Sequence, residues 1–180
     1  PLTAEAIPEP QYYDADGNLA SVVLNTDDWR ELFPEYKGTN ASDVHEASSY
    51  LNKQLWAETL LSMKGKGVNT VVVLAGGGGS GKSGVGKFFN QSEYPIRLDQ
   101  VSDTVGKLEG KIKEAKDAGF EIDYVFVDRP PRDAWHNGVV KRALDSRKNG
   151  QLARTVEINI AVKANLAARA TALAMLKSHS

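Results

Sequence analysis

The chain has 180 residues, a length that suits one domain with its own hydrophobic core. Its 22 lysines and arginines nearly balance 23 aspartates and glutamates, so the charge lacks the excess of a nucleic-acid-binding protein and favours a small-molecule ligand. The absence of cysteine excludes disulfides, and no apolar stretch is long enough to cross a membrane, so we expect a cytoplasmic protein that binds neither nucleic acid nor a membrane.

The N-terminal part predicts a lead-in and then a strand. Residues 1–18 hold three prolines and a turn-forming segment, so we expect an extended lead-in before a single domain over residues 19–180. Leu19 to Leu24 predict a strand that ends at Asn25. A short helical turn is expected from Trp29 to Phe33.

The remaining chain alternates between predicted helices and strands. A long helix is expected from Val44 to Met63, with Ser42 or Asp43 as its cap and with Gly65 and Gly67 ending it. Its predicted apolar side consists of Leu51, Leu55, Trp56, Thr59 and Leu60. Further helices are predicted over residues 104–118, 132–147 and 157–177, and strands over residues 70–75, 94–98 and 120–127.

This alternation predicts an α/β fold, a three-layer parallel sheet with helices on both faces. Ligands of such sheets bind beyond the carboxyl ends of the strands. Polar side chains follow several of these predicted ends, so we expect the functional site there.

The most specific motif follows the predicted strand over residues 70–75. A run of β-branched residues leads directly into Gly76-x-x-x-x-Gly81-Lys82-Ser83, the pattern of a phosphate-binding P-loop. We assign to nucleotide binding Gly76, Gly77, Gly78, Gly79, Ser80, Gly81, Lys82 and Ser83. The glycines let backbone N–H groups surround phosphate oxygens, Lys82 reaches the β- and γ-phosphates, and the Ser83 hydroxyl coordinates Mg²⁺. The motif predicts ATP or GTP with Mg²⁺, and a short helix from the loop to Phe89.

Two other interpretations of the motif remain open. The segment GGGGS has the composition of a flexible linker, although a linker would not continue a valine-rich strand into Gly-Lys-Ser. The loop is alternatively a degenerate P-loop that binds nucleotide without chemistry.

Three aspartates follow predicted strands. Asp27 is a candidate for the carboxylate that accepts a proton from an attacking hydroxyl, and Asp27 or Asp28 is equally a helix N-cap. Asp99 is likewise a site residue or a cap. Asp128 either holds Mg²⁺ through water or forms a surface pair with an arginine. Arginines that follow the last predicted strand, among them Arg142 and Arg154, suit either a phosphate-binding lid or a solvated helix face.

Two segments resemble signatures of the zeta toxin family of P-loop kinases. The first, Asp27-Asp28-Trp29-Arg30 through Pro34 and Tyr36, is similar to the family's D-x-[FW]-R-x-x-x-P-x-Y block. The second, His45-Glu46-Ala47-Ser48, is similar to its H-x-x-[AS]-S block. Residues 119–131, Arg142 and residues 153–156 resemble its penultimate strand and lid. The first block precedes the P-loop here, which resembles permuted zeta-like domains in large mobile-element proteins.

The resemblance implies a role for each matching residue. Asp27 would be the general base, Arg30 would orient the substrate, Asp99 would lie at the substrate or metal site, and Arg142 and Arg154 would act on the γ-phosphate. It also implies a kinase that phosphorylates a sugar hydroxyl of UDP-N-acetylglucosamine or of a related nucleotide, with an antitoxin as partner. The contrasting hypotheses are a nucleotide-gated interaction module and a P-loop protein that hydrolyses nucleotide without an acceptor.

Overall fold

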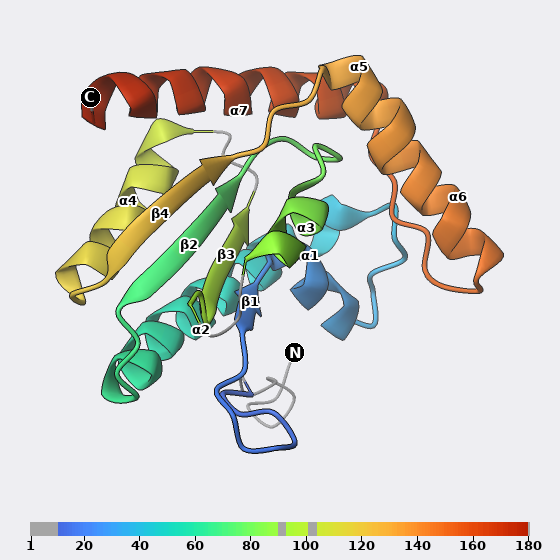
Figure 1. The fold of residues 1–180 in the computed structure, drawn as a ribbon. Helices are drawn as coiled ribbons and strands as arrows, with labels where there is room; N and C mark the ends of the chain where they lie inside the picture. The colour runs from blue at the N-terminus through green and yellow to red at the C-terminus, as the bar shows by residue number, and fades with distance from the viewer. Residues whose placement is uncertain (1–10, 90–92, 101–103, 180) are drawn as a thin grey trace.

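The computed structural model describes residues 11–89, 93–100 and 104–179 (Figure 1). The strands are β1 (Val22–Leu24), β2 (Thr70–Ala75), β3 (Ile96–Gln100) and β4 (Glu121–Phe126). The α-helices are α1 (Thr26–Trp29), α2 (His45–Gly65), α3 (Lys82–Val85), α4 (Val105–Asp117), α5 (Pro131–Asp133), α6 (Lys141–Lys148) and α7 (Ile158–His179). Short 3₁₀ helices are η2 (Arg30–Leu32), η3 (Ala41–Val44) and η4 (Gly86–Phe88), and η5 (Ala134–Val140) is a π-helix.

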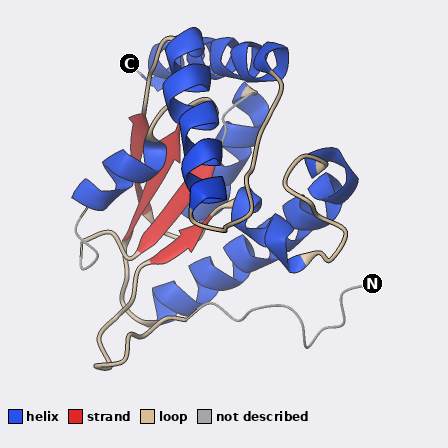
Figure 2. Ribbon diagram, turned by 90° about the vertical axis from the view of Figure 1, so that its right-hand side faces the viewer, coloured by secondary structure: helices blue, strands red, loops and turns tan. Residues whose placement is uncertain are grey.

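The four strands form one parallel sheet in the order β1-β3-β2-β4, so the chain has an α/β fold with helices packed against the sheet. Figure 2 shows the strands of this sheet, in red, among the helices. Because the strands are parallel, their carboxyl ends lie at the same edge of the sheet. The register pairs Leu74 of β2 with Asp99 of β3, which brings Asp99 beside the start of the P-loop.

The main hydrophobic core joins α2 and α4 to one face of the sheet. Trp56 of α2 is fully buried, and the Lys111 ammonium of α4 lies 5.5 Å from the centre of its ring. Val73 of β2 belongs to the same core. The next residue of β2, Leu74, points to the opposite face because side chains alternate along a strand, and there it lies beside Gly86 of η4.

Helix α7 runs across the top of the molecule in Figure 1, in contact with α4 and α5. Met175 of α7 reaches the main core. Arg169 donates two hydrogen bonds to the Asp128 carboxylate, at 3.1 and 2.7 Å. None of the helices in the described part of the chain is both long and apolar enough to span a membrane.

Most predicted elements are present, with changed boundaries. The predicted first strand is wrong at its start, because Leu19 instead forms an isolated antiparallel bridge with Tyr13 that closes a turn held by the Asp14 carboxylate. The apolar side predicted for α2 is confirmed, since Leu51, Leu55, Trp56, Thr59 and Leu60 are all buried. The predicted helix over residues 132–147 is interrupted by the π-turns of η5. Residues 1–10 of the predicted lead-in lie outside the described residues.

The predicted caps are wrong in three places. Asn25, and neither Asp27 nor Asp28, caps α1, since its side chain accepts a hydrogen bond of 3.0 Å from the Asp27 N–H. Helix α2 has no side-chain cap, because η3 leads into it directly. Asp99 caps no helix, because β3 continues through it to Gln100.

Candidate functional site

The glycines of the P-loop are required by backbone conformation and by close packing. Gly76, Gly79 and Gly81 have positive φ angles of 150°, 73° and 102°, a region that side chains disfavour. A Cβ at Gly79 would overlap the carbonyl oxygen of Ala134 in η5, and one at Gly138 would overlap Gly79 itself. The loop therefore fits tightly against η5, which a flexible linker would not do.

Several backbone N–H groups of the loop have no hydrogen-bond acceptor in the described part of the chain. Among the described residues, none accepts a hydrogen bond from the backbone N–H groups of Gly79, Gly81, Lys82 or Ser83. Lys82 and Ser83 are the first two residues of α3, and the N–H groups of a helix's first turn have no acceptor within the helix. Unpaired N–H groups grouped in this way suit an anion.

Lys82 is buried beside this loop. Its ammonium donates to the carbonyl oxygens of Gly76 and Gly77, at 3.3 and 3.1 Å, and lies 3.8 Å from a carboxylate oxygen of Asp99. Burial lowers the pKa of Lys82, and the nearby Arg142 adds to this, while Asp99 and Asp27 oppose it. Burial likewise raises the pKa of Asp99, with Lys82 and Arg97 opposing the rise.

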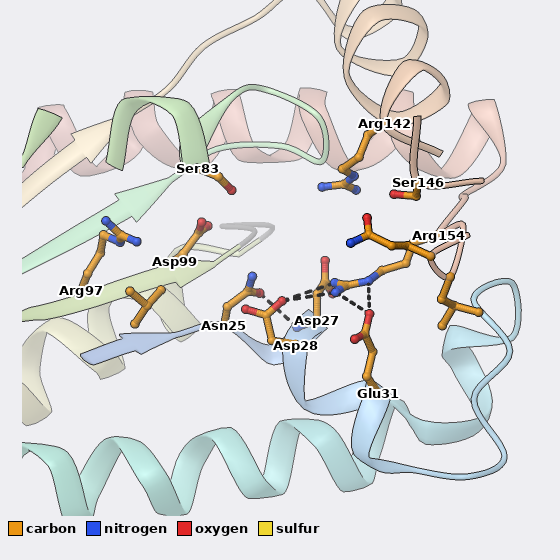
Figure 3. Close-up of a pocket in the computed structure, with 13 residues that line it drawn as sticks. Asn25, Asp27, Asp28, Glu31, Ser83, Arg97, Asp99, Arg142, Ser146 and Arg154 are labelled. Carbon is orange, nitrogen blue, oxygen red and sulfur yellow. Dashed lines mark hydrogen bonds and ion pairs between the residues drawn. The ribbon is translucent and has the colours of Figure 1, made fainter. Parts of the chain in front are cut away.

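Two adjoining cavities meet at the carboxyl ends of the strands. The first, about 650 Å³, is lined by the P-loop from Gly78 to Ser83 and by residues of α1, α2, α4 and η5; we call it the P-loop cavity. The second, about 590 Å³, lies under α6 beside α1 and η2; we call it the α6 cavity (Figure 3). Both are lined by Asn25, Asp27, Ser83, Asp99 and Arg142. Asp27, Ser83 and Arg142, three of the residues that the sequence analysis singled out, therefore lie in the wall that the two cavities share.

The Asp27 segment is held against α2 by polar contacts. Arg30 donates to Asp27, at 2.8 Å, and its guanidinium lies 3.5 Å from the His45 ring. The indole N–H of Trp29 donates to Asn52, at 2.8 Å. The two blocks that resemble zeta toxin signatures therefore pack on each other, and Asp27 is held by Arg30 at the wall of both cavities.

The two arginines considered for a phosphate-binding lid, Arg142 and Arg154, differ in their surroundings. Arg142 of α6 lines both cavities, and within residues 11–89, 93–100 and 104–179 no ion pair or hydrogen bond is recorded for its guanidinium. Arg154 instead pairs with Glu31, at 2.7 Å, and with Asp28, at 3.4 Å, as Figure 3 shows. Arg142 is thus available to an anion, whereas Arg154 joins the segment after α6 to α1 and η2.

Asp128 lies apart from the other candidates, since it lines neither cavity and its carboxylate is engaged by Arg169. The surface aspartate–arginine pair considered for it is present, although its partner comes from α7. No group of three or more histidine, cysteine or acidic side chains suited to a metal ion is found in the described part of the chain.

Two elements that no sequence motif marks, Asn165 and η5, support the loop. Asn165 of α7 is buried, and its amide donates to the carbonyl oxygen of Gly78, at 3.1 Å. The π-helix η5 brings Ala134 and Gly138 against Gly79. No motif marks either element, because a lone asparagine or glycine in a helical pattern carries no such signal.

Comparison of the chain with models of protein families and with curated protein sequences gives no match.

Proposed function

We propose that this chain is a kinase with a three-layer P-loop fold that transfers the γ-phosphoryl group of ATP, or GTP, to a hydroxyl of a small nucleotide-like acceptor. On the resemblance to zeta toxins, the acceptor is a sugar hydroxyl of a nucleotide sugar such as UDP-N-acetylglucosamine, or a related nucleotide. On the same ground, an antitoxin protein is the proposed partner.

One observation carries this proposal: Asp27, Ser83, Asp99 and Arg142 lie in the wall shared by two cavities, one of which is lined by the P-loop. Phosphoryl transfer needs two bound molecules that meet at one reactive point, and adjoining cavities provide space for both. A protein that only bound a nucleotide would not need the second cavity or a carboxylate at the junction.

The residues present fit the nucleotide and Mg²⁺. The unpaired N–H groups of the loop suit phosphate oxygens, and a hydroxyl with one or two carboxylates, here Ser83 with Asp99, suits Mg²⁺, which also takes phosphate oxygens and water. Bound Mg²⁺ would supply positive charge to the phosphate oxygens. Asp128 is a poorer candidate ligand, because Arg169 already holds it.

The chain's own residues then have distinct tasks. The Asp27 carboxylate accepts the proton of the acceptor hydroxyl, whose oxygen forms a new bond to the γ-phosphorus as the bond to the β-phosphate oxygen breaks. Lys82 and Arg142 balance the negative charge on the transferred group. Arg30 holds Asp27 in place through their ion pair.

The direct test is to incubate the purified chain with γ-labelled ATP or GTP, Mg²⁺ and a panel of nucleotide sugars and dinucleotides. Label in an acceptor supports the proposal. Release of free phosphate without a labelled acceptor would point to hydrolysis, which the engagement of Asp128 by Arg169 makes the weaker hypothesis.

A specific observation favours the nucleotide-gated interaction module as the second candidate. Helix α7, which contacts Gly78 of the P-loop through Asn165, exposes Leu166, Leu173 and Leu176 by 52%, 55% and 63%. Nucleotide binding without any transfer or hydrolysis would favour this alternative.

A further inference from the structure

Asn165 is one of the few buried polar residues of the molecule, and it lies outside both cavities. It is 6% exposed and belongs to the middle of α7. Its side-chain amide donates to Ala161 of its own helix, at 2.9 Å, and to Gly78 of the P-loop, at 3.1 Å. These two hydrogen bonds hold the Asn165 side chain against both its own helix and the P-loop.

The loop is shaped to receive this side chain. A Cβ at Gly77 would overlap the Asn165 amide, so only glycine permits the approach. Gly78, which receives the hydrogen bond, would have open space around a Cβ. The glycine at position 77 is therefore explained by Asn165, and not by an unusual backbone angle, since its φ is not positive.

The hydrogen bond fixes the direction of a peptide unit. In a planar trans peptide the C=O and the following N–H point in opposite directions. Because the Gly78 carbonyl is turned toward α7, the Gly79 N–H is turned away from α7. That N–H is one of the donors without a partner among the described residues.

We propose that Asn165 is a positioning residue, which orients the peptide between Gly78 and Gly79 so that the Gly79 N–H donates to a phosphate oxygen of the bound nucleotide. This inference rests on the proposed function. Loss of the Asn165 donor would leave the peptide free to turn, so the cost falls on binding of the phosphates and not on the transfer step.

The test compares Asn165→Ala, which removes the donor without adding a charge, with Asn159→Ala, the same change at an exposed position of α7. For each full-length protein the Kd of MgATP and of AMP, the KM for ATP, kcat and the unfolding midpoint are measured. We expect Asn165→Ala to raise the Kd and KM of ATP by about tenfold to a hundredfold, the range for a hydrogen bond to a charged group. We expect the AMP affinity and kcat to change by less than about threefold.

A second variant, Gly77→Ala, guards against misfolding of Asn165→Ala. Gly77→Ala should weaken MgATP binding because its methyl group displaces the Asn165 side chain. In an Asn165→Ala background the methyl group has room, so Gly77→Ala should lower MgATP affinity by a smaller factor there. Strictly additive effects of Gly77→Ala and Asn165→Ala on MgATP affinity would overturn the inference. Wild-type MgATP affinity in Asn165→Ala, or equal losses of ATP and AMP affinity, would also overturn it. If the wild-type protein itself does not bind MgATP, the proposed function fails and the inference with it.

Discussion

Asp27 and Lys82 line the same cavity although they follow different, non-adjacent strands of the sheet, β1 and β2. The negative charge of Asp27 is one of those that oppose the lowering of the Lys82 pKa by burial. A carboxylate and an ammonium that line one cavity are what the proposed transfer of a phosphoryl group needs, the first to accept a proton and the second to balance negative charge.

Asp27→Asn should therefore separate chemistry from nucleotide binding. The asparagine keeps the volume but cannot accept a proton, so we expect kcat to fall by about 10²- to 10⁴-fold, the usual contribution of a general base. The Kd of MgATP, measured by calorimetry, should change little. The control is Asp16→Asn, at an exposed aspartate of the N-terminal turn. Full turnover in Asp27→Asn would remove Asp27 from the mechanism.

Arg142→Gln should impair transfer more than binding. Its guanidinium lines both cavities and has no recorded partner in the described part of the chain, so it is available to balance charge in the transition state. Arginines with that role contribute about 10³- to 10⁵-fold to kcat. Arg147→Gln, at an exposed arginine of α6 that lines neither cavity, is the matched control. Equal kcat values for the two variants would exclude Arg142 from this role.

The sequence predicted the parallel sheet and the P-loop because both depend on local patterns. Valine runs predict buried strands, and the spacing of Gly76, Gly81, Lys82 and Ser83 follows from what phosphates require. Asp27 follows β1 and lines both cavities, whereas Asp128 follows β4 and lines neither, so a position after a strand does not by itself place a carboxylate at the cavities.

The supports of the site could not be predicted, because they depend on tertiary packing. The Gly78–Asn165 contact joins residues far apart in the chain, and the tight fit of Gly79 on η5 depends on π-turns that no propensity encodes. The pairing of Asp128 with Arg169 similarly required knowledge of where α7 lies.

Two glycine variants test the packing of the P-loop on η5. Gly79→Ala combines a positive φ of 73° with overlap of Ala134, so we expect it to lower the free energy of unfolding by about 2 kcal/mol or more. Gly78→Ala meets no atom within 4 Å and has no positive φ, so its stability should stay within about 0.5 kcal/mol of the wild type. Urea unfolding of both variants measures the difference, and similar stabilities would contradict the packing described for Gly79.

Arg154→Gln should change how stability depends on pH. Burial raises the pKa of Asp28, and Arg154 opposes the rise, so the variant should have a still higher Asp28 pKa. The pKa of Asp28 in the folded protein lies above its unfolded value of 3.8, so the folded protein holds more protons than the unfolded chain between these two values. Stability therefore falls as pH rises through this range. The variant's deficit should therefore be small below pH 3.8 and grow toward neutral pH, reaching about 1 kcal/mol or less because the pair is partly exposed. Urea unfolding across this pH range checks the trend, and a deficit that shrinks as pH rises would contradict it.

The Lys82 pKa should respond in opposite directions to its two neighbours. Asp99→Asn removes a negative charge that raises this pKa, so the pKa should fall further, whereas Arg142→Gln removes a positive charge and should raise it. NMR titration of the lysine side chains measures both, with Asp16→Asn as the control. The pKa of Lys82 in the folded protein lies below the 10.5 of the unfolded chain. Between these two pKa values the folded protein holds fewer protons than the unfolded chain, so its stability rises with pH in that range. This rise in stability should extend over a wider pH range in Asp99→Asn and over a narrower one in Arg142→Gln. Shifts of the Lys82 pKa in the same direction in both variants would contradict the placement of Lys82 near these two charges.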